Sequence, residues 1–163
     1  MKKFLPVPVI FLLAFIACKK TGNSTVTPAP VYSVTADING ASTSFSAKIT
    51  VDTSSTPGTI YIVAHSDTLN FTPLLEITLT GTSAITAGAY PDTVSNGRQG
   101  LLGYTGWNSN DTAYQYTSTT DTVTVTSVNK TTLAGTFQGT CQYFLDSTVT
   151  ITNGKFTVGL GQQ

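Results

Sequence analysis

One segment decides the fold class of this chain: Leu133-Ala134-Gly135-Thr136-Phe137-Gln138-Gly139-Thr140-Cys141-Gln142-Tyr143-Phe144-Leu145. Its odd positions read Leu, Gly, Phe, Gly, Cys, Tyr and Leu, whereas its even positions are mostly Thr and Gln. Successive side chains of a β-strand point to opposite faces, so this period of two predicts a strand with one face in a core. We expect Phe137, Cys141 and Tyr143 on that core face.

The same alternation recurs in most of the chain after residue 30. Apolar and polar residues take turns in the segments 32–38, 45–51, 75–79, 122–126 and 149–160. The segment 59–65 is apolar on both faces, as a central strand of a sheet would be. Asn39-Gly40 follows the first segment and suits a two-residue hairpin turn, and Asn153-Gly154 interrupts the last one.

No segment shows a sustained helical period with caps. We therefore predict an all-β domain of about nine or ten short strands, forming an antiparallel β-sandwich or a flattened barrel. The sandwich, with meander-like hairpins, is the favoured form. Composition agrees, because 32 of the 163 residues are threonine, which is β-branched, and there is one Met and one Glu.

Charge and hydrophobicity exclude two classes of protein. The chain has 8 basic and 8 acidic residues, and only 10% of it is charged. A nucleic-acid-binding domain would show a clustered Lys/Arg excess, so we expect no nucleic-acid partner. With 40% hydrophobic residues, the chain is also not a disordered acidic tail.

The first residues predict export. Two lysines precede an apolar run of thirteen residues, Phe4–Ile16, and then Ala17 and Cys18. This run is too short for a transmembrane helix, which needs about 20 residues, and is typical of a secretory signal peptide over residues 1–17. Ala14-Phe15-Ile16-Ala17-Cys18 resembles the lipobox of bacterial lipoproteins. That resemblance implies that Cys18 becomes the lipidated first residue and anchors the protein to a membrane; an ordinary cleaved signal is the alternative.

Residues 18–30 then form a lipidated tether, and residues 31–163 form a single β domain. The tether is polar, with one Gly, Pro28 and Pro30, and without periodicity. Once Cys18 carries lipid, Cys141 is left without a partner for an intramolecular disulfide. Cys141 also lacks a CxxC or Cys/His neighbourhood, which argues against zinc and redox chemistry.

The order of motifs resembles a family of small, uncharacterised all-β lipoproteins of Bacteroidota. The matching motifs are Ala36-Asp37-Ile38-Asn39-Gly40, Leu75-Glu76-Ile77-Thr78-Leu79, Gly135-Thr136-Phe137 and Ile151-Thr152-Asn153-Gly154-Lys155-Phe156. The resemblance implies a fold and a location, and it brings no activity or catalytic residue. Surface lipoproteins of that phylum often carry acidic residues after the cysteine. Residues 19–23 have none, so we expect an outer-membrane lipoprotein that faces the periplasm rather than the cell surface.

A second resemblance concerns glycosylation. Glycoproteins of this phylum are O-glycosylated in triplets of Asp, then Ser or Thr, then a small or aliphatic residue. Five triplets match, which makes the following residues candidate sites: Thr68, Thr93, Thr112, Thr122 and Ser147. The alternative is that Asp simply favours turns, with Thr starting the strand that follows.

The residues offer little for catalysis. His65 is the single histidine, so Cys141 with His65 is the one available nucleophile–base dyad for a hydrolase, and the predicted burial of Cys141 counts against it. The acidic residues lie mostly at turns or on polar faces, where a general acid with a raised pKa is not expected. We therefore expect a protein that is not an enzyme and holds no cofactor or metal. Calcium around residues 108–111 is a weaker alternative to an ordinary turn.

The segment Arg98–Tyr116 is the strongest candidate for a ligand site. It carries four large aromatic residues among glycines and amides: Tyr104, Trp107, Tyr114 and Tyr116. Flat rings beside amides suit a glycan or a peptide. The alternative is that these rings only cover the sheet. The leading hypothesis is a non-enzymatic binding or scaffold domain of the envelope that contacts a glycan or an envelope protein, and the alternative is a structural or assembly subunit of an outer-membrane complex.

Overall fold

The computed structural model describes residues 31–53, 58–69, 73–107, 113–143 and 147–161. These residues form strands joined by turns, without a helix. The strands are β1 (Ser33–Ile38), β2 (Ala41–Ser44), β3 (Lys48–Asp52), β4 (Thr59–His65), β5 (Leu74–Thr80), β6 (Gly88–Pro91), β7 (Gln99–Trp107), β8 (Ala113–Val128), β9 (Thr132–Tyr143) and β10 (Ser147–Gly159).

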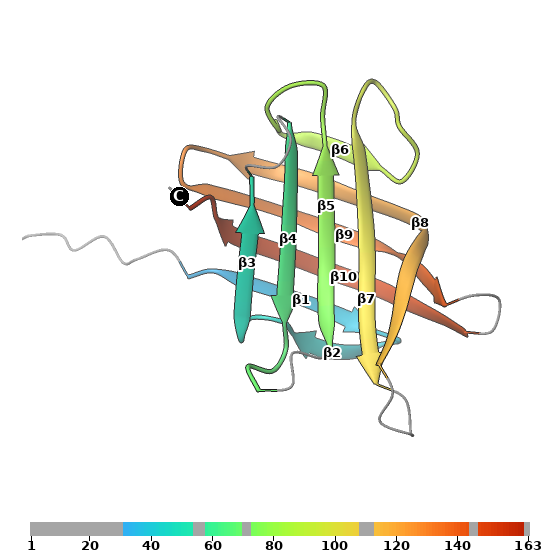
Figure 1. Cartoon of the computed structure of the whole chain (residues 1–163). Coiled ribbons are helices and arrows are strands. Elements are labelled where there is room, and N and C mark those ends of the chain that lie inside the picture. The colour runs from blue at the N-terminus through green and yellow to red at the C-terminus, as the bar shows by residue number, and fades with distance from the viewer. Residues whose placement is uncertain (1–30, 54–57, 70–72, 108–112, 144–146, 162–163) are drawn as a thin grey trace, which may run out of the picture.

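All neighbouring strands pair antiparallel in one sheet, in the order β2-β1-β10-β9-β8-β7-β5-β4-β3, with β6 paired to β8. The sheet curls into a half-barrel. In Figure 1, β3, β4, β5 and β7 form a front layer, and β1, β10 and β9 run across it behind. This confirms the all-β, antiparallel prediction, and the shape is consistent with a sandwich or a flattened barrel.

The long strand β8 joins the two layers. Its first part, Ala113–Thr117, pairs with β7, and its second part pairs with β6 through Thr122–Val125. Two register shifts interrupt its ladder with β9, between Ser118 and Thr120 and between Val125 and Ser127. Bulges bend a strand and increase its twist, so they let one strand belong to both layers.

The core lies on the concave side of the curled sheet. Leu75, Ile77 and Leu79 are fully buried, as their alternation predicts. The described part of the segment 133–145, which ends at Tyr143, behaves likewise, because Phe137 and Cys141 are buried, while Tyr143 is half-buried. Other fully buried side chains come from all parts of the sheet: Val34, Phe45, Ile62, Val123, Ile151 and Val158.

The first hairpin matches the prediction from the sequence only in part. Asn39 and Gly40 have φ angles of 51° and 82° and join β1 to β2, which confirms the predicted turn. The predicted continuous return strand over 45–51 is divided, however. Phe45 N donates to Val34 O of β1, whereas Ala47 N donates to His65 O of β4, so the chain crosses here from one sheet edge to the other.

Asn153-Gly154 interrupts the alternation without ending a strand. β10 continues through it, with a register shift against β9 between Ile151 and Gly154. A Cβ at Gly154 would collide with the backbone and ring of Phe137, so the bulge requires glycine.

Candidate functional site

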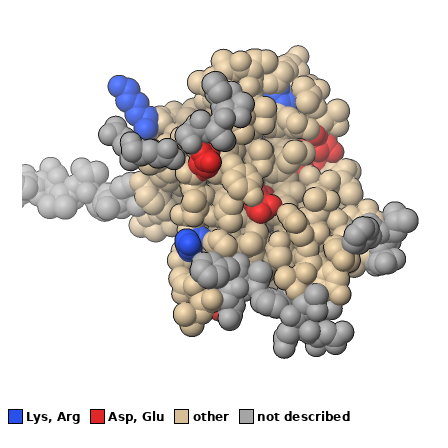
Figure 2. All heavy atoms as spheres, in the orientation of Figure 1, with Lys and Arg blue, Asp and Glu red and all other residues tan. Residues whose placement is uncertain are grey.

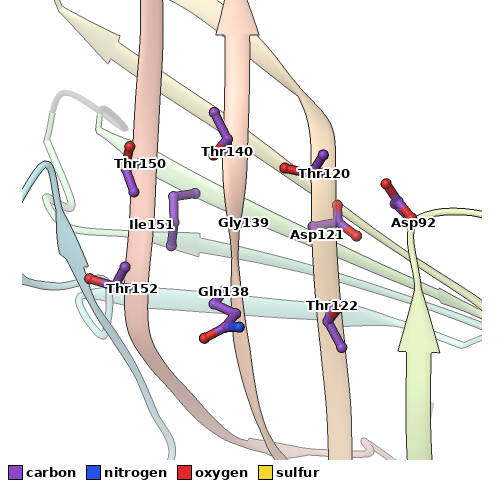
Figure 3. A pocket seen from close by; sticks show the side chains of 10 residues that line it. All are labelled: Asp92, Thr120, Asp121, Thr122, Gln138, Gly139, Thr140, Thr150, Ile151 and Thr152. Carbon is purple, nitrogen blue, oxygen red and sulfur yellow. The ribbon is translucent and has the colours of Figure 1, made fainter.

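The convex side of β8, β9 and β10 carries a dense array of hydroxyl and amide groups. Their neighbours in sequence, such as Val123, Phe137 and Ile151, point into the core, so these side chains point outward. We call this surface the threonine face and define it by eight residues: Thr120, Thr122, Thr124, Thr136, Gln138, Thr140, Thr150 and Thr152. Figure 3 labels all of them except Thr124 and Thr136.

Strand register aligns these side chains in rows across the sheet. Thr120 pairs with Thr140, which pairs with Thr150, and the next outward row contains Thr122 opposite Gln138. Outward residues two apart on a strand are separated by roughly 6.6 Å, and neighbouring strands by roughly 4.8 Å. The rows therefore form ridges that run across the strands.

A shallow groove of about 500 Å³ lies between these two rows, and we call it the central groove. Its ten lining residues are Asp92, Thr120, Asp121, Thr122, Gln138, Gly139, Thr140, Thr150, Ile151 and Thr152 (Figure 3). A second groove of about 390 Å³ shares Thr122 and Gln138 with it and ends near Lys155. The face thus offers two adjacent grooves with one polar ridge between them.

Glycine forms the floor of the central groove. Gly139 pairs with Asp121, and a Cβ at Gly139 would lie 2.6 Å from Asp121 Cβ and 2.7 Å from Thr120 O. Real Cβ atoms do not approach other atoms so closely, so a larger residue would push the two strands apart. Gly139 alternates with the outward Gln138 and Thr140, so it is its backbone that lies at the floor between the two rows.

Asp121 sits beside this floor and holds the point where β7 and β8 separate. Its side chain is buried, and its Oδ2 accepts a hydrogen bond from Leu102 N at 2.8 Å. Within the described part of the chain, Oδ1 has no hydrogen-bond partner. Burial, with a smaller contribution from the Asp92 carboxylate, raises the pKa of Asp121, against the lowering effect of hydrogen bonds from Ser118 and Leu102.

Three of the four predicted aromatic residues come together. Tyr104 pairs with Tyr116 in the β7–β8 ladder, and their ring centroids are 5.9 Å apart. Tyr114 contacts Tyr143 edge-on at 4.6 Å, and Tyr116 lies 6.0 Å from the same ring. We call Tyr104, Tyr114, Tyr116 and Tyr143 the aromatic cluster. Trp107 pairs with Ala113 at the end of β7, and its side chain lies outside the described part.

The aromatic cluster is half-buried and is continuous with the core. Tyr104 packs edge-on against the fully buried Phe45, with centroids 6.4 Å apart. Burial also raises the pKa of Tyr104. Tyr143 was absent from the predicted set, although its alternation with Cys141 placed it on the inner face of β9. Ligand binding by these rings stays a prediction, and the contacts give them a packing role in any case.

The opposite convex surface, formed by β3, β4, β5 and β7, carries scattered charged side chains (Figure 2). Glu76 of β5 lies over Gly103, where a Cβ would be 2.8 Å from Glu76 Oε2. Burial and the hydrogen bond with Glu76 raise the pKa of Tyr61 to about 12. This surface therefore has a carboxylate–phenol pair as well as hydroxyl groups such as those of Thr59 and Thr80, which are paired across β4 and β5.

Cys141 and His65, the candidate dyad, are both buried residues of the sheet. Cys141 is fully buried and its Sγ donates a long hydrogen bond to Leu102 O at 3.9 Å. Burial, helped by the charge of Asp121, raises the pKa of Cys141 to about 12, so it stays a thiol near neutral pH. His65 is buried at the end of β4, in register with Lys48 and Leu74.

The candidate glycosylation sites differ in accessibility. Thr68 and Thr93 are exposed in loops, whereas Thr122 is half-buried within β8. Ser147 Oγ donates to Tyr116 Oη at 3.4 Å. Thr112 lies outside the described residues, as do Cys18, the tether and the segment 108–111 proposed for calcium. All five glycosylation sites stay predictions.

Comparison with known proteins found no matching family model, curated protein or solved structure. Within the described residues, no group of three or more His, Cys, Asp or Glu side chains is placed to hold a metal ion. That part of the chain also contains no helix with the length and apolar character needed to cross a membrane.

Proposed function

We propose that this chain is a lipid-anchored protein of the bacterial outer membrane, facing the periplasm, whose β domain binds a glycan without catalysing a reaction. The lipobox-like sequence ending at Cys18 supports the anchor. The observation that carries the binding function is the pair of adjacent grooves on the threonine face.

The chemistry of the central groove suits a polyhydroxylated ligand. Threonine hydroxyls donate and accept hydrogen bonds, and Gln138 adds an amide with both capacities. Threonine methyl groups supply apolar contact between the hydroxyls. Of the ten lining residues only Asp92 and Asp121 are acidic and none is basic, and the Asp121 side chain is buried. A neutral saccharide would match this surface better than an anionic ligand would.

The width of the face permits several contacts at once. The rows cross β8, β9 and β10, and Asp92 after β6 stands at one end of the groove. With strands roughly 4.8 Å apart, the groove extends over more than 10 Å. A short saccharide lying across the strands would contact both ridges.

Affinity electrophoresis of the purified full-length chain in gels that contain neutral polysaccharides tests this function. Gln138→Ala removes the shared ridge amide, and Thr140→Val removes one hydroxyl while keeping the shape of the side chain. Each lost hydrogen bond is worth about 1 kcal/mol, so we expect about fivefold weaker binding per variant. Thr78→Val on β5, on the other convex surface, is the matched control and should bind as the wild type does. Equal retardation of all four proteins would refute a site on the threonine face.

A further inference from the structure

The strand β3 forms one edge of the sheet. It pairs with β4 along its whole length, and no other described strand forms a ladder with it. Figure 1 shows β3 at the left margin of the front layer, with the end of β10 running behind it. An edge strand presents backbone N–H and C=O groups that can pair with another chain.

The sequence of β3 is complementary to itself in antiparallel pairing. It reads Lys48-Ile49-Thr50-Val51-Asp52. If a second copy pairs with Thr50 opposite Thr50, then Lys48 lies opposite Asp52 of the second copy and Ile49 lies opposite Val51. Directly opposed residues of an antiparallel pair share a face. Both ion pairs would therefore lie on one face of the joined sheet, and both apolar pairs would lie on the other.

The apolar pairs would extend an existing surface. Ile49 and Val51 are half-buried and pack against the core. Beside them lies an open space of about 520 Å³, which is also lined by Tyr32, Gly159 and Leu160. A neighbouring strand on this side of β3 would cover apolar side chains that the single copy leaves partly exposed.

The other edge of the sheet lacks these properties. β2 consists of Ala41-Ser42-Thr43-Ser44, which has neither a charged nor a large apolar side chain. Edge strands commonly use lysine to prevent pairing with other chains. In β3 the lysine would meet an aspartate in a second copy of this chain, so the same charge that disfavours a foreign strand favours self-pairing.

We propose that the protein forms a two-fold symmetric dimer in which β3 pairs antiparallel with β3 of a second copy, centred on Thr50. Such an interface is isologous, since each copy contributes the same residues. It joins the two sheets through their front layers and leaves the threonine face of each copy free. The proposal does not depend on what that face binds.

Disulfide cross-linking of the full-length protein in native membranes tests the register. The Cys141 thiol is buried, and Cys18 is the predicted lipid site, so Thr50→Cys introduces one accessible thiol. Mild oxidation should convert most of the Thr50→Cys protein into a species of twice the mass that reverts on reduction. Ser42→Cys on β2 is the matched control and should stay monomeric. Equal cross-linking of the two variants, or no cross-linking of Thr50→Cys, would overturn the proposal. This holds also if the tether or another protein covers β3 in place of a second copy.

A charge swap tests the ion pairs separately. Sedimentation of the unlipidated Cys18→Ser chain gives the dimer dissociation constant. Lys48→Asp and Asp52→Lys each place two like-charge pairs across the interface and should weaken the dimer about tenfold. The double variant restores opposite charges and should recover the wild-type constant. Lys48 and Asp52 also have interactions within one copy, so thermal unfolding of each variant checks its fold. Single variants that dimerise like the wild type while folded would overturn the assigned register.

Discussion

Replacing Asp121 by Asn should stabilise the domain at neutral pH and lose that advantage in acid. The buried carboxylate has one partnered oxygen, Oδ2 with Leu102 N at 2.8 Å, and one oxygen without a partner among the described residues. Asn keeps an acceptor for Leu102 N and removes the buried charge. The amide nitrogen of Asn takes the place of the unpartnered oxygen, so the substitution removes the extra cost of the buried charge and keeps the cost of an unsatisfied polar group. We therefore expect Asp121→Asn to raise the free energy of unfolding by about 1 kcal/mol at pH 7.

The pH dependence follows from the sign of the pKa shift. Burial raises the pKa of Asp121 in the folded state above its value in the unfolded chain. The folded state therefore binds this proton more tightly, so protonation of Asp121 favours folding as the pH falls. The free energy of unfolding of the wild type, relative to that of the variant, should rise as the pH drops through the folded-state pKa. This rise should be complete below the unfolded-state pKa of about 3.9.

Urea unfolding of both proteins at a series of pH values measures this difference, because effects of other carboxyl groups cancel in it. Asp121→Ala is the companion variant. It leaves Leu102 N without its acceptor, so it should destabilise the domain at every pH. If Asp121→Asn is less stable than the wild type at pH 7, or gains on it in acid, then the native state stabilises the carboxylate and our account of this residue is wrong.

Two further predictions concern the anchor and the groove floor. Cys18→Ser should move the protein from the membrane fraction to the soluble fraction and abolish labelling with a radioactive fatty acid, because two or more acyl chains provide stable anchoring; unchanged fractionation would contradict the lipobox. Gly139→Ala should lower the free energy of unfolding by about 1–3 kcal/mol, because the new Cβ meets Asp121 and Thr120. Thr140→Ala, next along the strand, serves as its control, and equal urea midpoints would exclude the clash.

The period-two alternation was sufficient to predict most strands, because each strand has one face in the core. It predicted the inward residues of β5 and β9 correctly, since Leu75, Ile77, Phe137 and Cys141 are buried. It could not show that the chain crosses between sheet edges at residues 45–47. Phe45 is buried and Ala47 is exposed, and the alternation carries no information about which strand each segment joins.

The sequence predicted which side chains of the threonine face share one side of a strand, but not how they line up across strands. Alternation placed Thr122 and Thr124 on one side of their strand, and Thr136 and Thr140 on one side of theirs. The central groove depends on register, however, which sets Thr120 beside Thr140 and Thr150. Register is decided by packing between strands far apart in sequence, so the sequence indicated a local cluster of aromatic residues instead. Of these, Tyr104 and Tyr116 pack on each other, and Tyr114 packs on Tyr143.

Two of the three Asn-Gly pairs, Asn39-Gly40 and Asn153-Gly154, show how far local chemistry determines structure. Asn39 and Asn153 have nearly the same φ, 51° and 53°, so each asparagine adopts the left-handed conformation that its side chain tolerates. Gly40 also has a positive φ, which completes a two-residue turn, whereas Gly154 does not. With one left-handed residue the strand shifts register and continues, and the close contact of Gly154 with Phe137 leaves no room for a turn to open. The dipeptide therefore predicts an irregularity in the strand, and packing against the neighbouring strand decides whether the chain reverses or forms a bulge.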